Sequence, residues 1–324
     1  MPNESVACTL PAFELPRVAK VEERTLPRHV ADARSPWPRR ILVASDGSPA
    51  SDAAIAAAKV LAERSRASVE MTAVYSPRIP LPDCPERRGF EQCEGPERGE
   101  AATLLRTIRR QRRRSAPEIR AWPLHLEVGD PGAVITRLAK DSAAELVVLG
   151  IGELNPAERR YAGHTASCVA RYLQTPLFAA APGCEAPVRC VVALPDGRVH
   201  APTLRAAVAC LPPISTIWIA VPSRSSAAAP NGVQSESARE LVERACGPEL
   251  ADKIDSLKLE RVDLAGEIVA GVLKLVGDVG AQLIAVPNRG DPGPVRAFLE
   301  NLAEPLLLAA RCSVLVVPDA PVAA

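Results

Sequence analysis

The pattern of apolar and polar positions predicts strands that alternate with helices, and it occurs twice along the chain. Short apolar runs stop at an Asp-Gly turn in ILVASDGS (41–48) and again in VVALPDGR (191–198), and each leads into an alanine-rich helical stretch. Later in each half the apolar run returns, as LVVLG (146–150) and as LIAVP (283–287). Strands that alternate with helices predict a parallel sheet covered on both faces. The chain is therefore predicted to be a tandem duplication of one α/β unit.

The same periodicity predicts the individual elements of each half. In the first half, strands are expected at 41–45, 68–75, 122–128, 145–150 and 176–181, and helices at 51–64, 98–114, 131–142 and 162–173. In the second half, strands are expected at 189–194, 215–221, 257–263, 282–287 and 313–317, and helices at 201–210, 235–254, 266–277 and 295–310. In the helix at 98–114, for example, apolar residues recur at i, i+3, i+4 and i+7, which turns one apolar face to the sheet.

Turn and loop residues predict the domain boundaries. Residues 1–38 contain six prolines and little apolar periodicity, which predicts an irregular N-terminal extension. Two domains are expected at 39–183 and 187–318, followed by a tail at 319–324. The first domain is longer because of a segment rich in Pro, Gly and charge at 78–98, which predicts an inserted surface loop.

Composition narrows the class of protein. A chain of 324 residues with 47% hydrophobic residues can fill two cores. Its 39 Lys and Arg residues nearly balance 38 Asp and Glu, so no global field favours nucleic acid or an anionic membrane. No apolar run approaches the ~18 residues of a membrane span, and the first 30 residues lack the order of a signal peptide. We expect a cytoplasmic protein.

Other candidate chemistry is weak. The nine cysteines contain no close CxxC pair, which predicts free thiols in a reducing compartment; a redox pair or metal site at Cys84 and Cys93 is the alternative. The arginine-rich run at 106–114 predicts a solvated helix end, with an RNA or acidic-partner contact as the alternative, and the 3% aromatic content argues against base stacking. The four histidines show no metal-binding spacing, and no nucleophile elbow is present. The sequence therefore predicts neither a metal site nor an enzyme.

The first candidate binding position follows the first strand. In a doubly wound sheet, ligands bind at the carboxyl ends of the strands, where helix N-termini offer unpaired N–H groups. There the Asp46 carboxylate can accept hydrogen bonds from a ribose or an adenine edge, and Gly47 lets backbone approach closely. The alternative is that the Asp46-Gly47-Ser48 sequence only makes the turn and Ser51 caps the helix.

The second candidate position is the loop after the fourth strand. Gly150 and Gly163 flank a loop that ends on a helix start carrying Thr165, an arrangement that can wrap a phosphate chain with main-chain donors. Arg159 and Arg160 add positive charge. The alternative is an ordinary strand-helix loop with glycines at its turns.

Together these features resemble the universal stress protein family in tandem form. Further residues that carry the resemblance are VGDP (128–131), AAELVVLG (143–150), TPLFAAAP (175–182), GAQLIAVPNRG (280–290) and CSVLVVP (312–318). The resemblance implies two flavodoxin-like (adenine nucleotide alpha hydrolase-like) α/β domains, each with a five-stranded parallel sheet and helices on both faces. It also implies a role in stress physiology and, as in some members, ATP binding with Mg²⁺.

The chain departs from the family's phosphate loop, which reads G-x-x-G, nine residues, then G and Ser or Thr. Glu153 stands where the middle glycine is expected, with Gly152 one place early. His164 stands at the Ser or Thr position, with Thr165 one place late. A carboxylate that faces a triphosphate is repulsive and lowers affinity. The nucleotide site implied for the first domain consists of Asp46, Gly47, Gly150, Gly152, Gly163, His164 and Thr165.

The second domain departs further. Its glycine positions read Pro287, Gly290 and Glu300, followed by Asn301, so we interpret its phosphate loop as degenerate. The leading hypothesis is a binding and signalling module that holds an adenine nucleotide in the first domain and presents surfaces to a protein partner. The alternative is a scaffold for protein interaction in which neither domain binds nucleotide.

The resemblance also predicts how the two domains meet. The short closing strands at 176–181 and 313–317 are expected to pair across the domains as an intramolecular pseudo-dimer. Loose joining through residues 183–187 is the alternative, and a homodimer of whole chains is compatible with either.

Overall fold

The computed structural model describes residues 37–76, 88–89, 95–152, 159–195, 197–223, 237–288 and 302–319, with side chains from 98 in the second helix and from 165 in the fifth. Several sequence predictions lie outside these residues. They concern the N-terminal extension, most of the inserted loop with Cys84 and Cys93, Glu153, Asp196, the glycine positions at 290 and 300, and nearly all of the tail.

The first half contains the predicted alternation of strands and helices. Its elements are β1 (Arg40–Ala44), α1 (Pro49–Ser65), β2 (Ser68–Tyr75), β3 (Arg88–Gly89), α2 (Gly95–Arg114), α3 (Pro117–Ala121), β4 (Leu124–Val128), α4 (Pro131–Asp141), β5 (Leu146–Gly150), α5 (Arg159–Tyr172) and β6 (Leu177–Ala180). The short β3 and α3 were not predicted. Helices α2 and α5 each begin three residues before their predicted starts, and the earlier start of α5 shortens the candidate phosphate loop described below.

The second half repeats the plan. Its elements are β7 (Arg189–Ala193), α6 (Ala201–Cys210), β8 (Thr216–Pro222), α7 (Ala238–Cys246), the 3₁₀ helix η3 (Pro248–Leu250), α8 (Ala251–Asp255), β9 (Lys258–Leu264), α9 (Ile268–Val279), β10 (Leu283–Asn288), α11 (Ala303–Ala309) and β11 (Ser313–Pro318). The single helix predicted at 235–254 was wrong. Gly247, at φ 75°, ends α7, and Pro248 cannot continue it, so the chain restarts as η3 and α8.

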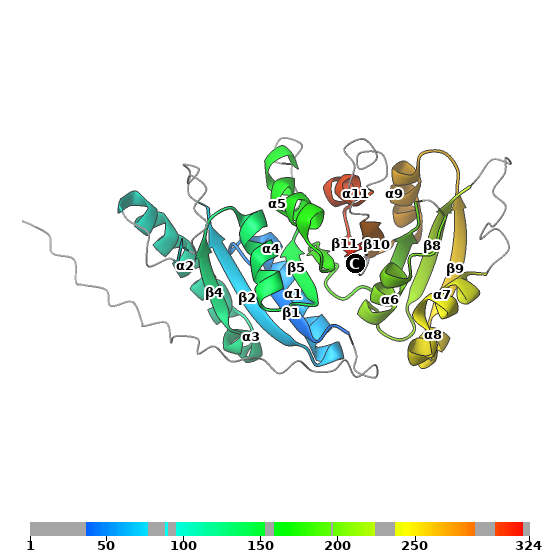
Figure 1. The fold of residues 1–324 in the computed structure, drawn as a ribbon, viewed down its shortest axis with the longest axis horizontal. Helices are drawn as coiled ribbons and strands as arrows, with labels where there is room; N and C mark the ends of the chain where they lie inside the picture. Colours follow the sequence, from blue (N-terminus) through cyan, green and yellow to red (C-terminus); the bar gives the residue numbers. More distant parts are fainter. Residues whose placement is uncertain are drawn as a thin grey trace, which may run out of the picture. The chain divides into compact units, whose positions relative to one another are not determined.

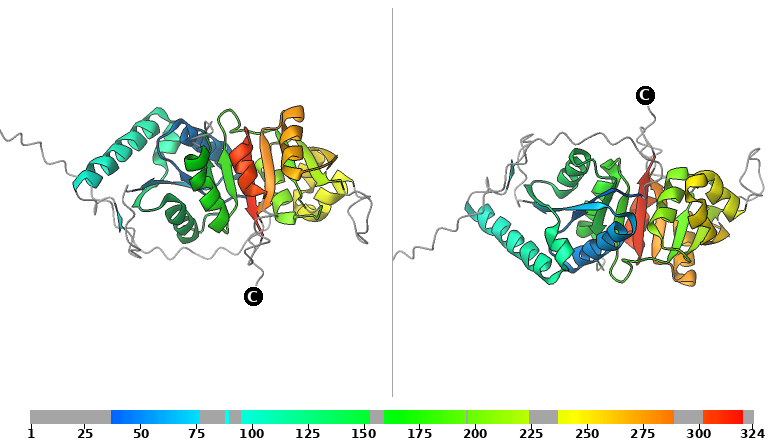
Figure 2. Two further views of the ribbon diagram at one scale, coloured as in Figure 1. Left: turned by 90° about the horizontal axis from the view of Figure 1, so that it is seen from above. Right: turned by 90° about the horizontal axis from the view of Figure 1, so that it is seen from below.

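All strands of the described residues join one sheet of eleven strands in the order β3-β4-β2-β1-β5-β6-β11-β10-β7-β8-β9 (Figure 1). Apart from β3, each half orders its five parallel strands as third, second, first, fourth and fifth. Helices cover both faces of the sheet (Figure 2). The predicted fold class is therefore confirmed, and the duplicated strand order supports the tandem interpretation. The domain boundaries stay a prediction because the sheet is continuous across them.

The two halves meet through their closing strands. β6 and β11 run antiparallel, with Phe178 opposite Leu315. Beside this pair, Ser313 Oγ accepts a hydrogen bond from Ala181 N at 3.0 Å and donates one to Cys184 O at 3.0 Å. The predicted pairing of closing strands is confirmed, and the alternative of loosely joined domains is wrong.

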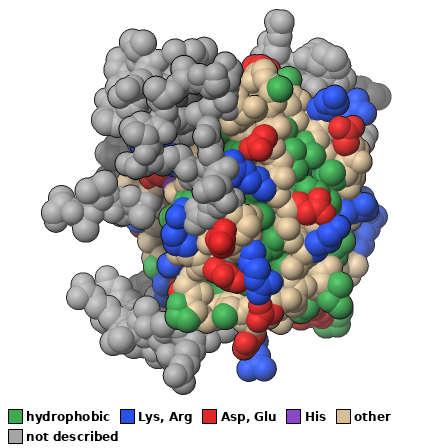
Figure 3. Space-filling model, turned by 90° about the vertical axis from the view of Figure 1, so that its right-hand side faces the viewer, with side chains coloured by type: hydrophobic (Ala, Val, Ile, Leu, Met, Phe, Trp, Pro, Cys, Tyr) green, Lys and Arg blue, Asp and Glu red, His purple; other side chains and the backbone are tan. Residues whose placement is uncertain are grey.

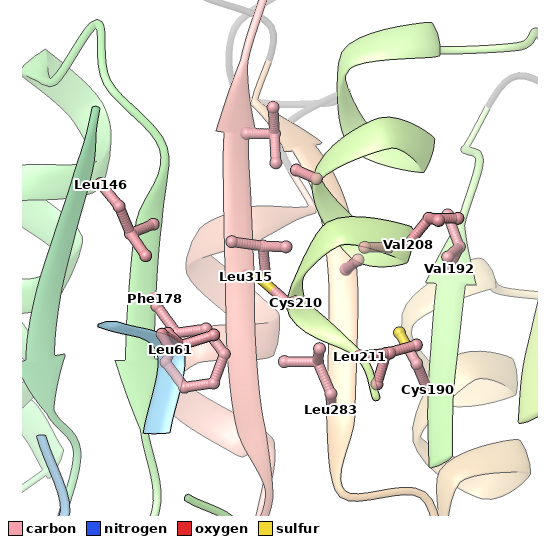
Figure 4. Packing of buried hydrophobic residues seen from close by; sticks show 14 of the residues in the cluster. Leu61, Leu146, Phe178, Cys190, Val192, Val208, Cys210, Leu211, Leu283 and Leu315 are labelled. Carbon is pink, nitrogen blue, oxygen red and sulfur yellow. The ribbon is translucent and has the colours of Figure 1, made fainter. Parts of the chain in front are cut away.

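Each face of the sheet carries an apolar cluster that extends through both halves. One cluster joins residues of α1 and β6 to residues of α6 and β10, and the other joins α4 and α5 to α11. At the boundary between the halves, Phe178 and Leu315 are both fully buried, and Leu61 of α1 and Cys210 of α6 pack around them (Figure 4). The described residues of both halves therefore belong to one compact unit.

The ends of the helices follow local capping chemistry. Asp130 Oδ1 accepts from Ala133 N at 2.9 Å and caps α4, with Pro131 in the first turn. Within the residues that the structure describes, no helix is both long enough and apolar enough to span a bilayer.

Candidate functional site

The strand order defines where a ligand would enter the first half. The order reverses between β1 and β5, which are parallel neighbours with Val43 opposite Val148. In open α/β sheets, ligands bind at such a reversal, outside the carboxyl ends of the two strands. The turn after β1 contains Asp46 and Gly47, and β5 ends at Gly150. The structure therefore brings these predicted residues to one edge of the sheet.

The turn at Asp46 is held by its own side chains. The exposed Asp46 carboxylate accepts a hydrogen bond from Ser48 N at 2.9 Å through Oδ1. Ser48 Oγ in turn accepts from Ser51 N at 3.3 Å, and Ser51 Oγ donates to Ser48 O at 2.8 Å. Ser48 is therefore the N-cap of α1, and the predicted cap at Ser51 was wrong. Ser48 has the extended backbone that an N-cap requires, with φ −74° and ψ 163°.

A buried polar network lies behind this turn. Gln111 of α2 accepts from Ser45 Oγ at 2.6 Å through Oε1, and its Nε2 donates to Ser51 Oγ at 2.9 Å and Asp52 Oδ1 at 2.6 Å. Gly47 N donates to Ser45 Oγ at 3.2 Å. Sequence reasoning missed this network. Its one local signal is that Gln111 is the only uncharged residue in the run RRQRRR (109–114).

Helix α2 packs against the turn at Gly47. Gly47 has a φ of +79°, and a Cβ at this position would lie 2.3 Å from Thr107 Cγ2. Both the backbone conformation and the close approach of α2 therefore require glycine. Through Thr107 and Gln111, α2 contacts the turn that contains Asp46.

Gly150 is required by packing between β5 and α1. A Cβ at Gly150 would lie 2.0 Å from Ala50 O and 2.8 Å from Ser51 N, both backbone atoms of the first turn of α1. A Cβ at the exposed Gly152 would meet only Ala50 Cβ, at 3.6 Å. The first glycine of the predicted phosphate loop thus has a structural role that needs no ligand.

Helix α5 begins earlier than expected, at Arg159. Only the first four N–H groups of a helix lack partners within it, so the donors that α5 leaves available belong to residues 159–162. Gly163, His164 and Thr165 lie beyond these donors, inside the helix, and Thr165 is half-buried. The role of these three residues in phosphate binding stays a prediction.

Near the carboxyl ends of β7 and β10 in the second half, two described side chains, His200 and Asn288, bond within the protein. His200 caps α6, where its Nδ1 accepts from Thr203 N at 3.3 Å and its Nε2 lies 2.5 Å from Asp319 Oδ1. At the end of β10, the buried Asn288 donates through Nδ2 to Ala170 O of α5 at 2.5 Å. The two halves therefore share strand order but differ at the carboxyl ends of their strands.

Comparison with known families agrees with this duplicated fold. The universal stress protein family matches the sequence at residues 38–180 and again at 216–318, which together make up most of the chain. The chain belongs to the universal stress protein family. No curated protein matches it.

Solved structures of universal stress proteins share the fold over nearly the whole chain. A universal stress protein from Archaeoglobus fulgidus DSM 4304 superposes with a TM-score of 0.59 at 12% identity, covering 88% of this chain and 97% of that one. A putative universal stress protein from Pseudomonas aeruginosa UCBPP-PA14 superposes with a TM-score of 0.50 at 12% identity, covering 90% and 96%. At these identities the likeness shows the tandem fold alone. A universal stress protein in complex with cAMP covers 44% of this chain at 22% identity, with a TM-score of 0.30.

The cysteines of this universal stress protein are free thiols wherever the structure describes them, as predicted. Burial raises the pKa of Cys210 and of Cys312 to about 12 and that of Cys246 to about 11, and Cys190 is also fully buried. Thiolate, the reactive form, is therefore scarce at neutral pH. No cluster of three or more His, Cys, Asp or Glu that would hold a metal occurs among the described residues.

These four thiols are expected to resist labelling in the native protein. At pH 8 a thiol reagent should modify Cys190, Cys210, Cys246 and Cys312 only after unfolding, because both access and thiolate formation are blocked. Mass spectrometry of labelled peptides, with the unfolded protein as the control, measures this directly. Prompt labelling of any of the four in the native state would contradict the buried arrangement.

Proposed function

We propose that this universal stress protein binds one adenine nucleotide, ATP with Mg²⁺, in its first half and acts as a nucleotide-responsive signalling module rather than as an enzyme. The observation that carries the proposal is the exposed Asp46 carboxylate at the reversal between β1 and β5. A carboxylate there can accept hydrogen bonds from ribose hydroxyls or from the adenine amino group. We place this activity in the cytoplasm, in the response to stress.

The surroundings of Asp46 are suited to hold a ligand in one orientation. The Ser45–Gln111 network and the contact between Gly47 and Thr107 fix the turn, so little conformational freedom is lost on binding. On the other side, the N–H groups at the start of α5, which have no bonding partner within the helix, favour phosphate, and two arginines of the sequence, Arg159 and Arg160, lie in that turn. Mg²⁺ would be held chiefly by the phosphates, as is usual for this ion.

The second half is proposed to bind no nucleotide. The N-terminus of α6, after β7, carries the His200–Asp319 pair. Asn288, at the end of β10, donates its hydrogen bond to Ala170 O of α5. The negatively charged carboxylate of Asp319 would repel a phosphate at this position. One site per chain is therefore expected.

Nucleotide binding is tested by calorimetric titration and by thermal unfolding with ATP and Mg²⁺. We expect one nucleotide per chain and, at about 100 times the dissociation constant, about 2.7 kcal/mol of added stability. Asp46→Ala should weaken binding by about 10- to 100-fold, the effect of losing a hydrogen bond to a charged group. Asp196→Ala, the same change in the second half, is the matched control and should leave affinity unchanged.

Three results would overturn the proposal. If millimolar ATP leaves the unfolding temperature unchanged, the first half binds no ATP. If Asp196→Ala weakens binding as much as Asp46→Ala, the second half is also a site. If the protein hydrolyses ATP steadily and Asp46→Ala abolishes this turnover, the protein is an enzyme.

A scaffold without nucleotide is the second candidate function, and one observation favours it. Gly47 and Gly150, the glycines that suggested close approach to a ligand, are both explained by contacts within the protein. In this case the surfaces of the continuous sheet and its helices would serve protein partners directly.

A further inference from the structure

The outward side of α2 carries an accumulation of unpaired arginines. From Ala101 to Ala116 the sequence contains six arginines and no acidic residue. Among the described residues, four of these arginines make no ion pair or side-chain hydrogen bond; three of the four are exposed and Arg109 is half-buried. We call these four the arginine stripe: Arg109, Arg110, Arg113 and Arg114.

Stability of the fold does not explain the stripe. Arg109 and Arg113 are four residues apart, as are Arg110 and Arg114, so they are helical neighbours of like charge, which is destabilising. Favourable interaction with the helix dipole is confined to the last turn, and the stripe begins before it. Arg112 is the arginine that stabilises this end of the helix: its Nη2 donates to Arg120 O and Trp122 O, each at 2.6 Å.

Several cations elsewhere on the molecule are paired with acids, unlike the four of the stripe. Lys59 pairs with Glu118 at 2.6 Å, and Arg239 pairs with Glu243, four residues along the same helix, at 2.7 Å. The end of the molecule at the right of Figure 1, seen face-on in Figure 3, shows blue and red side chains intermixed. The stripe lies on α2, at the opposite end of the sheet (Figure 1), so positive charge is segregated there although the whole chain carries only +1.

We infer that the arginine stripe is a docking surface for an acidic segment of a partner protein. All four residues are arginine, whose planar guanidinium binds carboxylates in a bidentate manner and is more weakly hydrated than the ammonium of lysine. Arginine is also enriched in protein interfaces, whereas lysine is depleted. Helix α2 contains no aromatic residue, which disfavours single-stranded nucleic acid, because its binding relies on base stacking. The inference does not depend on the proposed nucleotide site.

The test measures binding of a fluorescein-labelled decaglutamate peptide to the full chain by fluorescence anisotropy. Binding at roughly 20 mM salt should weaken steeply on moving to 0.2 M, since the Debye length then falls below about 10 Å. The variant R109Q/R110Q/R113Q should bind the peptide more weakly, by up to about tenfold, because three ion pairs with the peptide are lost at the protein surface. K140Q/K274Q/R311Q removes the same three charges from exposed positions elsewhere and should bind like the wild type.

Unfolding curves of both triple variants show whether a loss of peptide binding comes from misfolding. We expect the R109Q/R110Q/R113Q protein to be at least as stable as the wild type, because the substitutions relieve like-charge repulsion. The inference is overturned if the wild type does not bind the peptide at low salt, or if both variants weaken binding equally. It is also overturned if a 20-base-pair RNA duplex binds more tightly than the peptide and depends on the same three arginines, which would identify a nucleic-acid surface.

Discussion

Replacing Gly150 with alanine is expected to lower the free energy of unfolding by about 3 kcal/mol, the upper end for an inserted methyl group in a packed core. The new Cβ would stand 2.0 Å from Ala50 O and 2.3 Å from Ala50 C. Neither atom belongs to a side chain that can rotate away, so β5 or the first turn of α1 has to move. These two elements lie at the reversal of the strand order, and displacing them also disturbs the Asp46 turn.

Urea unfolding of the two glycine variants measures this effect. Gly152→Ala is the matched control, because its Cβ would lie 3.6 Å from Ala50 Cβ, an ordinary contact, on an exposed residue. It should change stability by no more than about 0.5 kcal/mol. Equal stability of the Gly150→Ala and Gly152→Ala proteins would show that the β5–α1 packing is not as close as described. Any effect of Gly150→Ala on ATP binding has to be interpreted through this loss of stability.

Phe178→Ala is expected to cost about 3–5 kcal/mol, because it removes a fully buried aromatic ring and leaves a cavity. Phe178 lies on β6, opposite Leu315 of β11, where the apolar cluster passes from one half to the other (Figure 4). The substitution should therefore destabilise both halves. Amide hydrogen exchange should accelerate in β7 as well as in β1, in a single cooperative transition.

Tyr172→Ala provides the control for this second experiment. Tyr172 ends α5 with 68% of its surface exposed, so its ring contributes little burial and the change should stay within about 0.5 kcal/mol. If Phe178→Ala accelerates exchange in β1 but leaves β7 protected, the two halves are separately stable domains. The shared core would then not couple them.

Local pattern in the sequence was enough for most of the fold. The apolar runs with short-range periodicity predicted all ten main strands, since a strand or helix depends on residues only a few positions apart. The exceptions have local causes too: Gly247 and Pro248 broke a predicted helix, and the two-residue β3 is too short to leave a pattern. The family resemblance supplied the pairing of β6 with β11, which no periodicity shows.

Less of the candidate site than of the fold could be predicted from the sequence. The sequence by itself determined that an Asp-Gly turn follows the first strand of each half and that Gly150 and Gly163 flank the loop after the fourth strand of the first half. Only the tertiary structure decided that Gln111 reaches Ser45 and that His200 meets Asp319, because these partners are far apart along the chain. It also decided what approaches Gly150. A glycine in a sequence signals that something comes close to the backbone, and only the packed structure shows that here it is the first turn of α1.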